Sequence, residues 1–311
     1  MNKAKDFPRP TKVHVALIVV WAAVTAAAQV IPTIPMALGL GGSFSFATAL
    51  APLAGIFFGP IYGVLCAAAG GFAGSIIAPH NAWLGLAHFI IGAVSAFTAG
   101  CIAWGGWPPV KISLKGNFII NGGIIVFLLG TILWFSNDIG RRLPMFPVVF
   151  YGLGLAALIA GSMFAGKFIA GKNHLLKFPG VMLCAFGGMA ASASIANFFF
   201  LMIHELPDSV WALLTVQAPA ERFLFSIGTA LVGVPLLICL PKVGIFIGPQ
   251  EEPEEEPPAE EPFRSASGPE TPAGDDSGLP PLPPLEDSPG DGAARDETAG
   301  DVKTGEFPPR F

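Results

Sequence analysis

The residues of this chain best equipped for chemistry are histidines, amides, charged groups and a tryptophan that interrupt long apolar runs. There are ten of them: His80, Asn81, Trp83, Asn137, Asp138, Arg141, Arg142, Asn197, His204 and Glu205. Such side chains can orient a small solute by hydrogen bonds and charge while an aromatic ring covers it. We therefore predict that these ten residues contribute to a solute-binding site, with the group at 137–142 in a lesser role.

Signatures of enzymes and metal sites are missing from the apolar part of the chain. It contains no HExxH, no GxSxG and no glycine loop followed by GK[ST]. The cysteines occur singly in apolar runs, without metal-ligand spacing, at Cys66, Cys101, Cys184 and Cys239. We expect neither a disulfide framework nor a zinc site, no cofactor, and no enzymatic activity.

Composition indicates an all-α membrane protein. Hydrophobic residues make up 52% of the chain and charged residues 13%, which is too apolar for a soluble domain. A helical span needs about 20 apolar residues, and only helices or closed barrels satisfy every backbone amide in lipid. The sequence predicts eight spanning segments, at 13–35, 43–58, 60–79, 82–105, 117–136, 146–170, 179–203 and 221–241. The expected surroundings are a lipid bilayer, with no nucleic acid partner.

The stretch 31–83 organises the predicted bundle. Two apolar runs meet at Gly59 and Pro60, a pattern that predicts a helical hairpin. The second run carries Gly63, Ala67 and Gly71 at four-residue spacing. Small residues so placed let a neighbouring helix approach closely. We expect this hairpin to be packed among other helices.

Charge divides the chain into two parts. Residues 1–250 hold 13 lysines and arginines against five acidic residues, whereas residues 251–311 carry a net charge of −13. The acidic, proline-rich end cannot bury enough apolar surface to offset its chain entropy. We predict a transmembrane domain over 1–248 and a disordered tail over 249–311, which is either a spacer or a docking strip.

The positions of the lysines predict orientation. With eight spans, both termini and six further lysines fall on one side, which the positive-inside rule makes cytoplasmic: Lys111, Lys115, Lys167, Lys172, Lys177 and Lys242. The acidic residues Asp138, Glu205, Asp208 and Glu221 then lie in outer loops. We expect a protein of the plasma membrane whose solute site faces outward.

The order of these features resembles the substrate-binding S component of energy-coupling factor transporters. The resemblance rests on a glycine-rich outer loop, the run SFATALAPLAGIFFGPIYG, a glycine-rich following helix and a polar outer turn. It covers most of 13–105 and 179–243. In that family an alanine pair of the first helix docks on the coupling subunit, and the matching residues here are Ala22 with Ala26 and Ala23 with Ala27.

The resemblance implies a fold and a function. The fold would be a six-helix core, with 106–178 as an inserted helical hairpin. The protein would capture a vitamin-like solute at the outer face beneath a lid formed by 32–43. A transmembrane coupling subunit and two ATPases would then drive uptake.

Two other functions stay open from the residues alone. One is a membrane-embedded enzyme that uses Asp138, His204 or Glu205 as acid or base. The other is a membrane anchor that recruits partners through the acidic tail. Within the bilayer, we interpret His88 as a hydrogen bond between helices in preference to a ligand or proton relay, and Asn197 as either a pocket or a packing residue.

Overall fold

The computed structural model describes residues 15–35, 43–105, 110–111, 119–204 and 207–250. All of them belong to one compact unit, Met1–Glu254. The predicted acidic tail lies almost wholly outside the described residues, so its disorder stays a prediction.

Helices dominate the described part of the chain. They are α1 (Val15–Ala28), α2 (Ala47–Ile77), α3 (Phe89–Ala103), α4 (Gly122–Ser136), α5 (Asp138–Arg142), α6 (Gly152–Ala170), α7 (His174–Ile203) and α8 (Asp208–Cys239). Short 3-10 turns occupy η1 (Pro79–Asn81), η2 (Gly85–His88) and η4 (Leu240–Val243), and a π-helix occupies η3 (Pro147–Tyr151). Two small antiparallel pairs complete the fold, β1 (Pro32–Pro35) with β2 (Ser43–Ser45) and β3 (Val110–Lys111) with β4 (Ile119–Ile120).

The helices support the predicted membrane class. Within the described residues, five helical stretches are long and apolar enough to cross a membrane: Ala47–Ile77, Gly85–Ala103, Pro147–Ala170, His174–Ile203 and Asp208–Val243. Two shorter apolar helices, Val15–Ala28 and Gly122–Ser136, accompany them. The chain is a helical protein with several apolar spans, and the total of eight crossings stays a prediction.

Helix α2 is the predicted hairpin. Its arms, 47–58 and 60–77, meet at Gly59, whose φ of 82° and ψ of 175° interrupt the helix. A Cβ built on Gly63 would lie 2.5 Å from the Cα of Gly55, although eight residues of a straight helix rise about 12 Å. The second arm therefore returns along the first. Glycine suits position 59 because a positive φ is unfavourable for other residues.

Small residues bring α2 and α3 together at the hairpin turn. A Cβ on Gly55 would overlap the carbonyl oxygen of Ala96, and one on Gly100 would lie 2.7 Å from the nitrogen of Pro60. The indole Nε1 of Trp104 donates to the Ile56 carbonyl over 3.0 Å. This contact leaves no room for larger side chains, as expected where helices pack through small residues.

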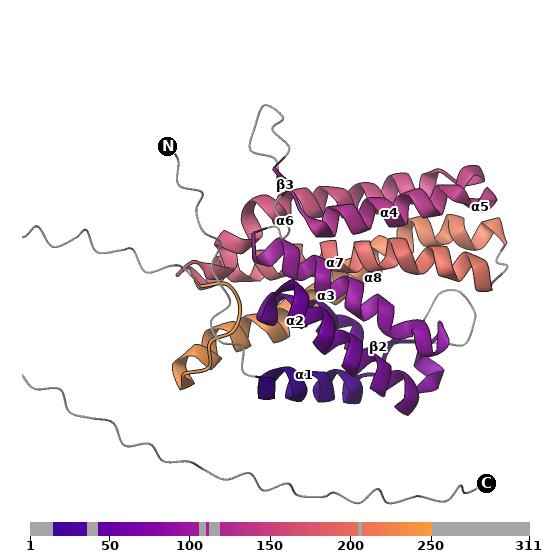
Figure 1. The fold of residues 1–311 in the computed structure, drawn as a ribbon. Helices are drawn as coiled ribbons and strands as arrows, with labels where there is room; N and C mark the ends of the chain where they lie inside the picture. Colours follow the sequence, from indigo (N-terminus) through magenta and orange to yellow (C-terminus); the bar gives the residue numbers. More distant parts are fainter. Residues whose placement is uncertain (1–14, 36–42, 106–109, 112–118, 205–206, 251–311) are drawn as a thin grey trace, which may run out of the picture. The chain divides into compact units, whose positions relative to one another are not determined.

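Helix α7 is the centre of the second half of the unit. It packs against α3, α4, α6 and α8, and Figure 1 shows α4, α6 and α7 running alongside one another. Buried rings pack between α4, η3 and α8, where Trp134 lies 4.9 Å from both Phe146 and Trp211 between ring centroids. The predicted insertion, 106–178, thus supplies helices that pack against α7.

The beginning of the last long helix was predicted wrongly. The expected segment began at residue 221, whereas α8 begins at Asp208 and contains Pro219. Proline removes one backbone donor, but a membrane helix tolerates the loss when neighbouring groups compensate for it. Glu221, expected in an outer loop, is therefore a buried helical residue, and its carboxylate accepts from Gln217 Nε2 over 2.8 Å.

Candidate functional site

A small β-hairpin links α1 to α2 and positions Phe44. In the β1–β2 pair, Pro32 lies opposite Ser45 and Pro35 opposite Ser43. The Thr33 hydroxyl donates to the Phe44 carbonyl over 2.8 Å, which ties the two strands together. The predicted lid, 32–43, includes β1, and its residues 36–42 lie outside the described part.

Beside this hairpin is a cavity of about 70 Å³. One water needs about 10–15 Å³ in the same measure, so the cavity has room for about five waters or a ring-sized ligand group. Its walls come from α1, β2, α2, α3, α7 and α8 and from the η1–η2 segment. Among the residues that line it are Gln29, Phe44, Thr48, Trp83, His88, Gly92, Ser95, Met189, Ser192, Asn197 and Arg222.

Three polar groups of this lining are buried without a hydrogen-bond partner among the described residues. They are the Nε of Arg222, the Nδ1 of His88 and the Oγ of Ser95. An unpaired buried polar atom costs about 1–3 kcal/mol, and such atoms are rare in folded proteins. Three of the eight such atoms among the described residues border this cavity, where a polar ligand would satisfy them.

Arg222 carries the only fixed charge among the described residues that line the cavity. Its guanidinium carbon lies 4.5 Å from the centroid of the Phe44 ring, a cation–π contact that fixes its position. The carboxylate of the preceding residue, Glu221, interacts electrostatically with Arg222 and accepts a hydrogen bond from Gln217. The Nε–H of Arg222 remains without an acceptor among the described residues.

Trp83 forms an aromatic wall of the cavity. Its ring lies edge-on to His88 at 5.5 Å and to Phe200 at 5.3 Å between centroids. Behind it, His204 packs on Phe200 at 4.5 Å and does not line the cavity. Asn197 does line it, and its Nδ2 donates to the Tyr151 hydroxyl over 3.2 Å.

Asn81 has a different place from the one that the sequence suggested. It is buried and absent from the lining, and its Oδ1 accepts from Ser43 Oγ over 3.0 Å. Its Nδ2 donates to the Gln29 carbonyl over 2.8 Å, and Ser45 Oγ donates to Gln29 Oε1, also over 2.8 Å. Asn81 thus connects η1, α1 and β2. The neighbouring His80 is exposed and lies outside the lining.

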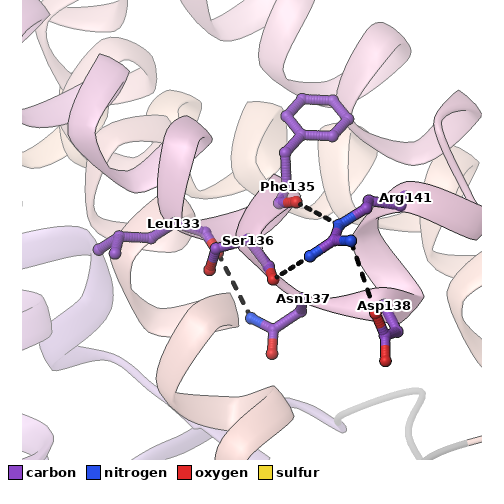
Figure 2. A network of polar contacts seen from close by, with 6 residues as sticks. All are labelled: Leu133, Phe135, Ser136, Asn137, Asp138 and Arg141. Atoms are coloured by element: carbon purple, nitrogen blue, oxygen red, sulfur yellow. Dashed lines mark hydrogen bonds and ion pairs between the residues drawn. The ribbon is translucent and has the colours of Figure 1, made fainter.

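In the group at 137–142, Asn137 joins α4 to α5 and the other three residues belong to α5, and none of the four lines the cavity. Figure 2 shows the contacts of Asn137, Asp138 and Arg141. Arg141 donates to the carbonyls of Phe135 and Ser136 over 3.2 and 3.0 Å, which satisfies the end of α4. Its ion pair with Asp138, at 3.9 Å, is exposed. Asn137 Nδ2 donates to the Leu133 carbonyl over 3.4 Å. These contacts close a turn.

Arg142 completes that group with a contact to another helix. Its Nη1 lies 4.0 Å from the carboxylate of Asp208 at the beginning of α8, and both side chains are more than half exposed. An exposed pair of this kind contributes about 0–1 kcal/mol. Arg142 does not line the cavity.

The two alanine pairs of α1 point in different directions. Ala22 and Ala26 face the second arm of α2, where a Cβ on Gly70 would lie 2.6 Å from the Ala22 carbonyl oxygen and one on Gly74 3.4 Å from the Ala26 Cα. Ala23 and Ala27 are exposed. Of the two pairs, only Ala23 and Ala27 are accessible to another subunit in the described part of the chain.

Sequence reasoning found part of this arrangement. Of the ten predicted residues, Trp83 and Asn197 line the cavity, and Glu205 lies outside the described residues. The Nδ1 of His88 has no hydrogen-bond partner among the described residues, so our interpretation of His88 as a hydrogen bond between helices stays a prediction. Arg222 was missed because the predicted segment 221–241 places it at the end of a span, beside the outer loop. Its position among apolar residues of a spanning helix was the available signal.

The fold and the cavity define the chain as a helical protein with several helices apolar and long enough to span a membrane, and with a mainly apolar pocket that carries a few polar groups. Comparison with protein-family models, curated proteins and solved structures found no significant match. Among the described residues, no group of three His, Cys, Asp or Glu side chains is placed to hold a metal ion.

Proposed function

We propose that this chain is the solute-binding subunit of an energy-coupling factor importer. It would capture a small, vitamin-like solute in the cavity beside the β1–β2 hairpin. A transmembrane coupling subunit and two ATPases would supply the energy for uptake. The observation that carries the proposal is the cavity itself, which gathers three unpartnered polar groups beneath an aromatic wall.

The β1–β2 hairpin supports the capture step. It contributes Phe44 to the cavity lining, and the network of Asn81, Gln29 and Ser43 holds it against α1 and η1. We propose that this hairpin belongs to the lid predicted over 32–43.

The exposed face of α1 supports the coupling step. Ala23 and Ala27 lie beside the exposed valines Val19, Val20 and Val24. Small residues spaced by four allow another helix to approach closely within a membrane. We propose this face as the docking surface for the coupling subunit, with the chain in the plasma membrane and both termini cytoplasmic.

An uptake assay tests the proposal. The full chain would be produced with a coupling subunit and ATPases, and entry of candidate solutes measured with and without ATP. The variant Ala23→Leu with Ala27→Leu should abolish uptake and leave solute binding unchanged, because it adds bulk only to the docking face. Arginine at the same two positions should have the same effect. Ala26 is unsuitable for this test because it packs on Gly74.

The matched control is Ala156→Leu, on an exposed position of α6. It adds one leucine to an exposed face of another apolar helix and should leave uptake intact. Uptake that persists in the α1 double variant would contradict the docking assignment. Solute binding without ATP-dependent uptake by any coupling partner would contradict the transport proposal.

A further inference from the structure

The lining of the cavity indicates a class of solute, and this inference rests on the proposed function. We propose that the pocket binds a small organic monoanion whose carboxylate pairs with Arg222 and whose apolar or aromatic body lies against Trp83. Three observations lead to it: the charge of the lining, its unpaired donors, and the shape of its walls.

Among the described residues, the lining carries one positive charge, that of Arg222, which a ligand with one negative charge would balance. Arg222 is the only fixed charge among the described residues of the pocket, and no carboxylate in the described part forms a salt bridge with it. Glu221, the acidic neighbour in sequence, interacts electrostatically with Arg222, but its carboxylate is hydrogen-bonded to Gln217 and does not line the pocket. A cation within a membrane bundle is costly unless an opposite charge accompanies it. A monoanion would neutralise the pocket, whereas a doubly charged phosphate would leave an excess charge.

The unpaired donors fit a carboxylate. The guanidinium carbon lies 4.5 Å from the centroid of the Phe44 ring, a contact that fixes the group without using a hydrogen-bond acceptor. Arginine and carboxylate match as planar groups and form two parallel hydrogen bonds. The Nε of Arg222 already lacks an acceptor. Binding a carboxylate oxygen there would satisfy it.

The rest of the lining fits an apolar body with a further polar group. Trp83 and Met189 offer apolar walls, and the small residues Gly92 and Ala193 leave space between the helices. The Nδ1 of His88 and the Oγ of Ser95 provide two more unpartnered polar atoms. A ring-sized body with one polar substituent would use these groups as well as the charge of Arg222.

Acids and their amides of equal shape test this assignment. The full chain in nanodiscs of zwitterionic lipid would be titrated calorimetrically with benzoate and benzamide, with nicotinate and nicotinamide, and with cyclohexanecarboxylate and its amide. At least one acid should bind ten-fold or more tightly than its amide. Phenyl phosphate should bind more weakly than benzoate, because one cation balances one negative charge.

Variants of the cation make the test specific. Arg222→Gln should weaken binding of the acid ten-fold or more and leave binding of the amide unchanged, which also shows that the variant folds. Arg222→Lys should keep part of the preference, because it keeps the charge and loses the planar pairing. The control Arg142→Gln removes an exposed arginine outside the lining and should change neither affinity.

Several results would overturn the inference. They are amides that bind as tightly as their acids, no binding by any acid of the panel, tighter binding of phenyl phosphate than of benzoate, or an acid preference that survives in Arg222→Gln. Failure of the proposed function has a different signature. In that case the acid preference would depend on Arg222 while ATP-driven uptake stayed absent with every coupling subunit.

Discussion

Helices α2 and α3 are in close backbone contact at the hairpin turn of α2, whereas near Gly92 they line the cavity. At the hairpin turn, a Cβ on Gly100 of α3 would lie 2.7 Å from Pro60. Two turns earlier in the same helix, a Cβ on Gly92 would meet nothing closer than Ala51 Cβ at 3.7 Å. The hydrogen-bonding groups differ in the same way. Trp104 Nε1 has a partner at the turn, whereas Ser95 Oγ in the cavity has none.

This contrast indicates that the cavity does not result from generally poor packing between these two helices. The same two helices achieve backbone contact where small residues meet, and the hollow appears where unpaired polar side chains gather. Unpaired buried polar groups lower stability, and three of the eight such atoms among the described residues lie around this cavity, where a bound ligand would satisfy them. Four substitutions test the contrast, from the largest expected effect to the smallest.

Substitution at the closed contact should have the largest effect. Gly55→Leu places a side chain onto the Ala96 carbonyl, where helix backbones would have to separate. We expect a loss of about 3 kcal/mol or more in the free energy of unfolding, seen as poor yield and a large fall in melting temperature. Gly152→Ala is the control, because its Cβ would meet nothing within 4 Å. A stable Gly55→Leu protein would contradict the packing described for the turn.

Removing Asn81, which holds the β1–β2 hairpin by hydrogen bonds, should have the second-largest effect. Asn81→Ala leaves the Gln29 carbonyl and the Ser43 hydroxyl without their partner. We expect a cost of about 1–3 kcal/mol, measured by thermal unfolding in detergent. Solute affinity should fall as well, because Phe44 and Gln29 would lose their fixed positions in the lining. Unchanged stability would show that this network does not hold the hairpin.

Filling the hollow should affect binding more than folding. Gly92→Leu has space for its Cβ, and the rest of its side chain would occupy the cavity. We expect a ten-fold or greater loss of solute affinity by titration, with a melting temperature close to that of the wild type. Full affinity in a folded Gly92→Leu protein would place the ligand elsewhere.

The smallest effect is expected in the α4–α5 turn. Arg141→Ala removes an exposed ion pair and two bonds to carbonyls at the end of α4. The expected loss is about 1 kcal/mol or less, visible as a small shift in thermal unfolding. Solute affinity should not change. A marked loss of solute affinity would show that Arg141 contributes to the binding site, as the sequence predicted.

The sequence predicted the fold better than the site. Gly59 and Pro60 between apolar runs specify a hairpin, because one supplies a positive φ and the other lacks a backbone donor. The identity of a polar residue does not specify its partner. Asn81 and Arg141 have side chains that could bind a ligand, yet these side chains donate hydrogen bonds to backbone carbonyls of the protein. Arg222 was missed because α8 begins 13 residues before the predicted 221.

The central claim is that the cavity beside the β1–β2 hairpin holds a small solute. Native mass spectrometry of the full chain, extracted gently from the membrane in which it is produced and exposed to a mixture of small metabolites, tests it most directly. We expect one small-molecule adduct per chain, which Trp83→Ala and Gly92→Leu remove and Arg142→Gln keeps. A chain that stays bare under all conditions, or an adduct that survives both cavity variants, would contradict the claim.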